Sequence, residues 1–260
     1  MTRVETGPGW ELRLGRWQEA LAHVTECDAV ITDPPYSERT HSGHDAGATL
    51  ANRGEWERSD GKLDRCRTRT ELSYTSWDRD DVDAFTETWS PRNRGWFVCL
   101  SDSELCSDYR QSFESCGLTG FHPLPCVIRG MTVRLSGDGP SSWAIYANVA
   151  RPKALSKWGT LPGAYTSGQG ERAHIGGKPL DLMRAITRDY TRPGDLVVDP
   201  CAGGGTTLLA AVMEGRRAIG AECDEKTFEK AVARLRKGYT PTLFQPEAAP
   251  MEQTALWGAE

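Results

Sequence analysis

The stretch LVVDPCAGGGTTLLAAVMEGRRAIGAE, residues 196–222, decides the fold. It begins with the β-branched segment Leu196–Asp199, passes through a glycine-rich turn and continues with an apolar segment, Thr206–Glu214, before a second strand-like segment, Arg217–Glu222. A strand, a helix and a second strand in this order pair their strands in parallel through a right-handed crossover. The sequence therefore predicts an α/β fold with a doubly wound, mostly parallel sheet.

The other expected elements alternate in the same way. We expect strands at Glu11–Leu14, Asp28–Thr32, Trp96–Leu100, Phe121–Ile128, Met131–Leu135 and Trp143–Asn148, and helices at Gln18–His23, Asp80–Trp89, Ser103–Ser115, Pro179–Asp189 and Glu225–Arg236. A single domain is predicted over residues 1–238, with a long mobile loop at 37–78 and a flexible, proline-punctuated tail at 239–260.

The composition is that of a globular protein that can bury its own core: 260 residues, 38% hydrophobic and 26% charged. The eight cysteines include no C-x-x-C pair, so we expect reduced thiols in a cytoplasmic protein. The first residues lack the apolar core of a signal peptide, and the longest apolar run, Leu208–Met213, is far shorter than the roughly 20 residues that span a bilayer. Neither secretion nor a membrane partner is expected.

The charge is unevenly distributed along the chain. The net charge of −5 argues against a nucleic-acid partner, but residues 121–180 carry seven Lys or Arg and two acidic residues, a local net of +5. Because exposed charges more than about 8–10 Å apart are screened at physiological salt, a polyanion responds to the local patch rather than to the total. This segment is a candidate nucleic-acid surface, and a solvated, loop-rich face is the alternative.

A glycine-rich turn, Gly203–Gly205, lies inside the opening stretch. Glycines allow a tight turn and let the backbone approach a ligand. A phosphate-binding loop needs a lysine where Thr206 stands, and a dinucleotide fold usually has a third glycine on the helix, so a nucleoside without a pyrophosphate is the favoured ligand. Glu222 follows Asp199 by 23 residues, which suits a carboxylate that binds ribose hydroxyls; a cap on the next helix is the alternative.

The tetrapeptide Asp33-Pro34-Pro35-Tyr36 directly follows the expected buried strand Asp28–Thr32. It should therefore lie at the carboxyl edge of the sheet, where open α/β folds bind ligands. The two prolines remove two backbone donors, so the turn offers a carboxylate and carbonyls that can only accept hydrogen bonds. Such a turn can hold a planar amino group beside an aromatic ring, although as a lone strand-ending turn it would be unremarkable.

With these two motifs the sequence resembles the S-adenosylmethionine-dependent amino-methyltransferases of DNA. That family carries a (D/N/S)PP(Y/F/W) motif and a DPFAGSGTT-like motif, similar to DPPY at 33–36 and DPCAGGGTT at 199–207. HIGGKPLDLMRAIT at 174–187 and GRRAIGAECDEKTFEKAVARL at 215–235 resemble two further segments of the family. The order, with DPPY first, is that of the beta group, which places a target-recognition region between the motifs, here about 121–177.

The chain departs from the family pattern at three places. Cys201 stands where the family usually has Phe, and Gly15 is followed by Arg16 where the family often has an Asp that meets the adenine of the cofactor. HIGGKP replaces HPTQKP, so that only the His, the Lys and the Pro of that segment carry over. The middle of the chain is shorter than in restriction-associated members and shows no recognisable match.

The resemblance implies an enzyme that transfers a methyl group from S-adenosylmethionine to the N6 amine of a flipped-out adenine in double-stranded DNA. N4 of cytosine is the alternative, less favoured because Asp is commoner in the first motif position of adenine enzymes; an RNA base or a protein glutamine is less favoured still. The catalytic residues implied are Asp33, Pro34, Pro35 and Tyr36. The cofactor-binding residues implied are Lys178, Pro179, Asp199, Pro200, Cys201, Ala202, Gly203, Gly205, Thr206, Glu222 and Cys223.

Methyl transfer to an exocyclic amine requires a group that activates this weak nucleophile. The lone pair of an exocyclic amine is delocalised into its ring, and hydrogen bonds to the Asp33 carboxylate and the Pro34 carbonyl would turn it toward the methyl group, with Asp33 as a proton acceptor. Cytosine C5 methylation needs a cysteine nucleophile instead. Pro125-Cys126 and Pro200-Cys201 lack the Gln that should follow, and no Glu-Asn-Val partner occurs, so this chemistry is rejected and Cys126 is interpreted as a core thiol.

Basic side chains near these motifs are the candidate DNA contacts. They are Arg39, His41, His44, Arg129, Arg134, Arg151, Lys153, Lys157 and Arg172. The spacing His41-x-x-His44-Asp45 also resembles a metal site, but no third and fourth ligands cluster nearby in the sequence, so no metal is expected.

Two further partner hypotheses remain. One is a homodimer. The other is a weak contact between the tail and the replication sliding clamp, because Gln253-Thr-Ala-Leu256-Trp257 resembles Gln-x-x-Leu-Phe clamp-binding peptides. Packing of the tail onto its own domain is the favoured alternative.

Overall fold

A computed structural model of the chain describes residues 3–40, 75–129, 142–155, 158–168 and 177–238, together with the short strands β4 (Trp56–Glu57) and β5 (Leu63–Asp64). The expected strand Met131–Leu135, most of the loop 37–78 and the tail 239–260 lie outside the described residues.

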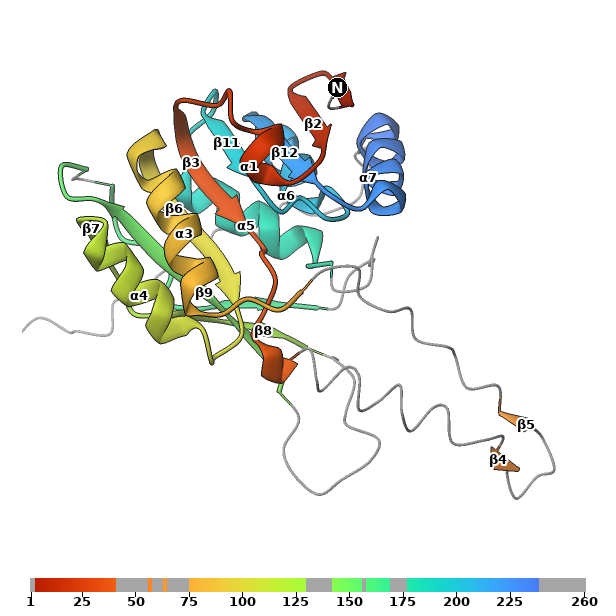
Figure 1. Ribbon diagram of the computed structural model, residues 1–260, viewed down its shortest axis with the longest axis horizontal. Helices are drawn as coiled ribbons and strands as arrows, with labels where there is room; N and C mark the ends of the chain where they lie inside the picture. Colours follow the sequence, from red (N-terminus) through yellow and green to blue (C-terminus); the bar gives the residue numbers. More distant parts are fainter. Residues whose placement is uncertain are drawn as a thin grey trace, which may run out of the picture.

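The described residues fold around one large sheet with the strand order β1-β2-β12-β11-β3-β6-β9-β8-β10 (Figure 1). Strands β2, β12, β11, β3 and β6 pair in parallel, β9 runs antiparallel to its neighbours β6 and β8, and β7 pairs with β9 beside this path. The strands are β1 (Val4–Gly7), β2 (Trp10–Leu14), β3 (Cys27–Thr32), β6 (Asn93–Ser101), β7 (Leu118–Gly120), β8 (Leu124–Ile128), β9 (Ala144–Pro152), β10 (Tyr165–Ser167), β11 (Leu196–Asp199) and β12 (Arg217–Glu222).

Helices cover both faces of this sheet, which confirms the doubly wound α/β prediction (Figure 1). Alternate side chains of the buried strands serve two cores: Ala29 and Ile31 of β3 join the core under α5, α6 and α7, while Val30 joins the core under α1, α3 and α4. The helices are α1 (Trp17–Ala20), α3 (Arg79–Trp89), η1 (Ser90–Arg92), α4 (Cys106–Ser115), α5 (Leu180–Tyr190), α6 (Thr206–Met213) and α7 (Glu225–Lys237).

Several boundaries differ from the sequence predictions for local reasons. Helix α4 begins three residues later than expected because the Asp102 carboxylate accepts a hydrogen bond from the Leu105 backbone N–H, 3.4 Å away, and holds a turn before the helix. Pro179 is the N-cap of α5 rather than a residue of its first turn. Strand β9 runs on to Pro152 because β7, which periodicity did not predict, pairs with its end. Helix α1 is a single short turn. Strands β1 and β10 were not predicted from the sequence.

None of the helices within the described ranges is both long enough and apolar enough to cross a bilayer.

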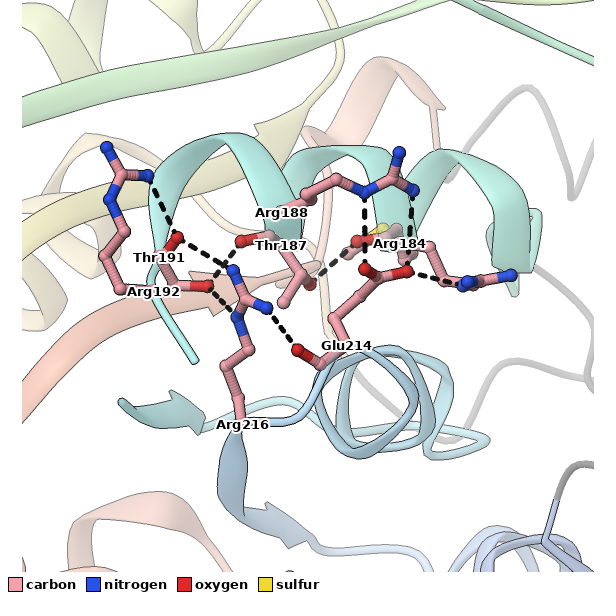
Figure 2. A network of polar contacts seen from close by, with 8 residues as sticks. Arg184, Thr187, Arg188, Thr191, Arg192, Glu214 and Arg216 are labelled. Atoms are coloured by element: carbon pink, nitrogen blue, oxygen red, sulfur yellow. Dashed lines mark hydrogen bonds and ion pairs between the residues drawn. The ribbon is translucent and has the colours of Figure 1, made fainter. Parts of the chain in front are cut away.

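One end of α5 is fastened to the turn between α6 and β12 by a polar network (Figure 2). The Glu214 carboxylate accepts hydrogen bonds from Nε of Arg184, at 2.7 Å, and from Nε of Arg188, at 3.2 Å. Arg216, which is 7% exposed, donates to the side-chain and backbone oxygens of Thr191, at 2.8 and 2.9 Å, and to the Glu214 carbonyl. Because Lys178 and Pro179 directly precede α5, this network also helps to fix the start of the helix at the opposite edge of the sheet.

This network predicts that Glu214→Gln lowers the free energy of unfolding at pH 7 by about 1 kcal/mol, through the loss of charge-assisted hydrogen bonds. Burial opposes the charged carboxylate, but hydrogen bonds from Arg188 and Arg184 outweigh it and hold the pKa of Glu214 below its ordinary value of 4.5. The carboxylate therefore stabilises the fold above that ordinary pKa, and this stabilisation is lost as the pH falls through the lowered pKa.

Urea denaturation at pH 7 and at acid pH tests this expectation, with Glu114→Gln in the exposed pair with Arg110 on α4 as the control. The destabilisation by Glu214→Gln should shrink in acid, while the control should change little at either pH. An equal destabilisation at both pH values would contradict the ion-pair interpretation.

Candidate active site

The two sequence motifs leave the sheet side by side. Strands β3 and β11 are parallel neighbours, with Val30 opposite Val198, so the DPPY turn after β3 and the glycine turn after β11 start at the same carboxyl edge. The hydroxyl of Thr32, the last residue of β3, donates a 2.7 Å hydrogen bond to Oδ1 of Asp199, the last residue of β11. The structure thus brings together motifs that are separated by more than 160 residues of sequence.

Asp199 organises the glycine turn from inside the protein. Its side chain is 1% exposed, and Oδ1 also accepts a 3.1 Å hydrogen bond from the backbone N–H of Cys201. Burial raises the pKa of Asp199 to about 7 against the opposing effect of these hydrogen bonds. The carboxyl group therefore sits near the midpoint of its titration at neutral pH and braces the backbone that a ligand would meet.

Two glycines of the turn, Gly203 and Gly205, differ in their local surroundings. Gly205 is the N-cap of α6 at a φ of 72°, and a Cβ there would come within 3.4 Å of side-chain atoms of Ala231 and Leu235 on α7. Gly203 has a φ of 50°, and a Cβ there would meet no atom within 4 Å. Both positions thus have a positive φ that favours glycine, and Gly203 in addition has open space where a side chain would stand.

The DPPY side of the site is a compact polar cluster. Oδ1 of Asp33 accepts a 3.0 Å hydrogen bond from the Tyr36 hydroxyl, and Oδ2 accepts one from Nζ of Lys178 at 2.5 Å. The Lys178 ammonium also lies 4.8 Å from the centre of the Tyr36 ring. Burial raises the pKa of Tyr36 well above its ordinary value, so its hydroxyl stays protonated and remains a donor. Lys178, predicted to bind the cofactor, therefore contacts two residues of the DPPY motif.

An acid that the sequence reasoning missed anchors the chain after DPPY. Asp102 follows β6, and its Oδ2 accepts hydrogen bonds from the backbone N–H of Ser37 at 3.1 Å, from the Ser37 hydroxyl at 2.6 Å and from the Thr40 hydroxyl. The Trp77 backbone N–H bonds the Tyr36 carbonyl at 3.0 Å. The position of Asp102 directly after a buried strand, like that of Asp33, is the sequence signal that could have identified it.

Tyr109 on α4 is a second residue that the sequence reasoning missed. It is fully buried, and its hydroxyl has no hydrogen-bond partner among the residues that the structure describes. Burial raises its pKa, and Cys99, Cys201, Asp33 and Asp102 raise it further, so the hydroxyl stays protonated. Nothing in the local sequence distinguishes it from an ordinary core tyrosine.

At the end of β12, Glu222 accepts a 2.7 Å hydrogen bond from the Asp224 backbone N–H through Oε1. Asp224 itself caps α7 by accepting from the Thr227 backbone N–H at 2.8 Å. The role of helix cap, which was the alternative for Glu222, thus belongs to Asp224. Gly15 also reaches this edge, because its N–H donates to the Glu222 carbonyl at 2.9 Å, which brings the Gly15-Arg16 turn beside the end of β12.

The basic residues predicted to contact DNA do not all lie near this edge. Arg129 follows β8 at the same carboxyl edge, and Arg39 pairs with Glu104 at 3.1 Å just beyond the DPPY turn. Arg151 and Lys153 lie at the other end of the sheet, where Arg151 stacks on the rings of Trp96 and Phe121. The remaining five, which lie outside the described residues, are His41, His44, Arg134, Lys157 and Arg172.

No group of three or more His, Cys, Asp and Glu side chains that could hold a metal occurs within the part of the chain that the structure describes. Cys126, on β8, is fully buried, and burial raises its pKa to about 12, so it is a core thiol rather than a nucleophile.

Comparison with known proteins agrees with this arrangement. Residues 131–233 match the family model described as DNA methylase. M.HindIII, a type II methyltransferase of Haemophilus influenzae, is 44% identical over 62 residues, which are 24% of this chain and 20% of that protein. The chain therefore spans about a fifth of the length of that relative.

Solved structures share the fold. The crystal structure of the M1.HpyAVI–SAM complex matches with a TM-score of 0.62 at 20% identity, over 86% of this chain and 99% of that one. The PvuII DNA methyltransferase, which is cytosine-N4-specific, matches with a TM-score of 0.62 at 16% identity, over 88% of this chain and 86% of that one. At these identities the likeness is one of fold.

The architecture is similar to that of these two solved structures, and both motif turns lie at the carboxyl edge of the sheet. The match of residues 131–233 to the DNA methylase family model agrees with the resemblance of the sequence motifs.

The burial of Asp199 predicts a specific pH dependence of stability. Because its folded-state pKa is raised from 3.8 to about 7, the folded state holds this proton more tightly than the unfolded state does, and stability should fall as the pH rises through this window. Asp199→Asn removes the titration. The stability of the variant relative to wild type should therefore increase between pH 5 and pH 7.5.

Urea denaturation at both pH values checks this, with Asp80→Asn at an exposed position on α3 as the control. If wild type and Asp199→Asn keep a constant stability difference across the window, Asp199 does not titrate as its burial requires.

Proposed function

We propose that this chain transfers a methyl group from S-adenosylmethionine to the N6 amine of adenine in double-stranded DNA, with N4 of cytosine as the alternative target. The observation that carries the proposal is the position of the Asp33 carboxylate next to the glycine turn, joined to it through the hydrogen bond between Thr32 and Asp199. A methyl donor held by one turn and an amine held by the other would meet at this edge.

The residues of the glycine turn fit a nucleoside cofactor. Glu222 lies at the end of the next strand with a carboxylate suited to two ribose hydroxyls, and Gly203 leaves the backbone open to a ligand. Pro200, Cys201 and Ala202 complete the turn, in which the Ala202 N–H is bonded to the Ala221 carbonyl at 2.8 Å. When bound, S-adenosylmethionine supplies a methyl group on a positively charged sulfur, an electrophile that the amine can attack directly.

The DPPY turn supplies the hydrogen-bond acceptors that orient the amine. The Asp33 carboxylate and the Pro34 carbonyl accept hydrogen bonds from the two amine hydrogens, which directs the nitrogen lone pair toward the methyl group. The proton that the amine loses on methylation goes to Asp33 or through it to water. Tyr36 stacks on the base, and this stacking offsets part of the cost of flipping the base out of the duplex.

The geometry of the site does not separate adenine from cytosine, because both bases present a planar exocyclic amine. The Asp in the first position of DPPY supports adenine, through the resemblance described above, whereas the likeness in fold to the cytosine-N4-specific PvuII enzyme keeps N4 of cytosine as the alternative. Nucleoside analysis of methylated DNA distinguishes the two products.

The proposal predicts that the protein incorporates labelled methyl groups from S-adenosylmethionine into duplex DNA and that Asp33→Ala lowers this rate by at least a hundredfold. The loss follows from removing the acceptor that orients the amine, and the calorimetric Kd for S-adenosylmethionine should change much less. Glu87→Ala, at an exposed position on α3, is the matched loss of a carboxylate and should retain activity.

Label in RNA or protein rather than in DNA would refute the proposed substrate. An Asp33→Ala variant that loses cofactor binding and turnover to the same extent would refute the role of Asp33 on the amine. Digestion of the labelled DNA to nucleosides then identifies N6-methyladenine or N4-methylcytosine.

DNA that presents a flipped base to this edge should pass over Arg129 rather than over the far end of the sheet. Arg129→Gln is therefore expected to weaken DNA binding and to lower the slope of log K against log salt by up to about 0.9, the value for one phosphate contact. Lys153→Gln, directly after β9, should leave the slope nearly unchanged. The converse result in a salt titration by fluorescence anisotropy would place the DNA on the opposite edge.

A further inference from the structure

Lys178 occupies the two surfaces of the DPPY turn that a target base would use. The carboxylate of Asp33 has both oxygens engaged, one by the Tyr36 hydroxyl at 3.0 Å and the other by the Lys178 ammonium at 2.5 Å. The same ammonium lies 4.8 Å from the centre of the Tyr36 ring. The Lys178 side chain is 11% exposed, so this cation is enclosed with its partners rather than held in solvent.

A flipped base needs the same contacts. Its amine must donate to Asp33, and its ring must stack on Tyr36, so the base and the ammonium cannot occupy the site together. We propose that Lys178 is a positioning residue of the base pocket, which holds Asp33 and Tyr36 in their receiving geometry and is displaced when the target base enters. This inference rests on the proposed function and extends it to a residue that sequence similarity assigned to the cofactor.

The exchange replaces each contact with a related one. The ammonium donates to a carboxylate and lies by an aromatic ring, and the incoming base likewise donates N–H groups to the carboxylate and stacks on the ring. Lysine suits this role because its charge sits on a flexible four-carbon stem, so the head group can move while the backbone at the start of α5 stays fixed. Without an occupant, the Asp33 carboxylate would lose a charge-assisted partner at a site that is largely shielded from solvent.

If Lys178 is displaced by the base, its loss should change the affinity for DNA in the direction opposite to the loss of a simple DNA contact. Removal of a lysine that binds phosphate or positions the cofactor weakens DNA binding, whereas removal of a competitor strengthens it. The reason is that the apparent Kd equals the intrinsic Kd divided by the fraction of molecules whose pocket is free. Lys178→Met keeps the length of the stem and removes the charge. It should lower the Kd for a duplex with the target site by about tenfold.

The experiment first maps the methylated site by sequencing DNA that the wild-type protein has modified. Fluorescence anisotropy then gives the Kd for a duplex with that site, in the presence of S-adenosylhomocysteine, for wild type, Lys178→Met and Lys178→Arg. Lys230→Met, at an exposed position on α7, controls for the loss of one positive charge. We expect tighter binding by Lys178→Met alone, and Lys178→Arg, which keeps the charge, should stay within about twofold of wild type.

A second duplex replaces the target base with the analogue that lacks the amine but keeps the ring, which is purine for adenine or pyrimidin-2-one for cytosine. Lys178→Met should tighten binding of both duplexes by the same factor, because the amine bonds Asp33 only after the lysine has left. Unchanged or weaker binding of both duplexes by Lys178→Met, or a gain confined to the duplex that has the amine, would overturn the inference.

A measurement on the wild-type protein covers the case in which Lys178→Met does not fold. Acetic anhydride labelling with peptide mass spectrometry should show faster acetylation of Lys178 when the duplex with the target site is bound and no acceleration with a duplex that lacks it. Protection of Lys178 by the target duplex would overturn the inference. Failure of the wild type to methylate any DNA overturns the proposed function and this inference together, whereas methylation with protected Lys178 overturns this inference alone.

Discussion

The parallel pairing of β3 with β11, closed by the 2.7 Å hydrogen bond from Thr32 to Asp199, is the constraint on which the rest of the site depends. It fixes the relative position of two turns that are distant in sequence, and in the proposed reaction each turn holds one of the two reacting groups. Because both strands are buried on both faces, a shift of their register would turn core side chains toward the wrong core. The packing of the sheet therefore protects the geometry of the site.

The edge itself is built from acids with different tasks. Asp199 is buried and holds the glycine turn, and Asp102 ties the chain after DPPY to the end of β6. Asp33 is the one of these three acids for which a cation contact is seen, with Lys178. Such a division fits a site in which only one carboxylate must exchange partners. Asp199 and Asp102 keep their backbone donors, since loss of these hydrogen bonds would destabilise the fold.

Much of this arrangement could be predicted from the sequence, and the reasons are local. The alternation of strands and helices, the turn at Gly203–Gly205 and the DPPY turn after a buried strand all follow from residue patterns within short windows. The contacts of Lys178 could not be predicted in this way, because they depend on where the start of α5 lies relative to β3. Arg151 shows the same limit: its charge indicated a DNA contact, but the direction of β9 places it far from the DPPY turn.

The most direct test of this account is a crystal structure of the protein with S-adenosylhomocysteine. The account predicts that the ligand's ribose lies at Glu222 and its sulfur on the Asp33 side of the glycine turn, so that an amine bound to Asp33 could approach a transferred methyl carbon to about 3–3.5 Å. A ligand bound elsewhere on the sheet, or one with its sulfur directed away from Asp33, would contradict the claim that the two turns form one transfer site.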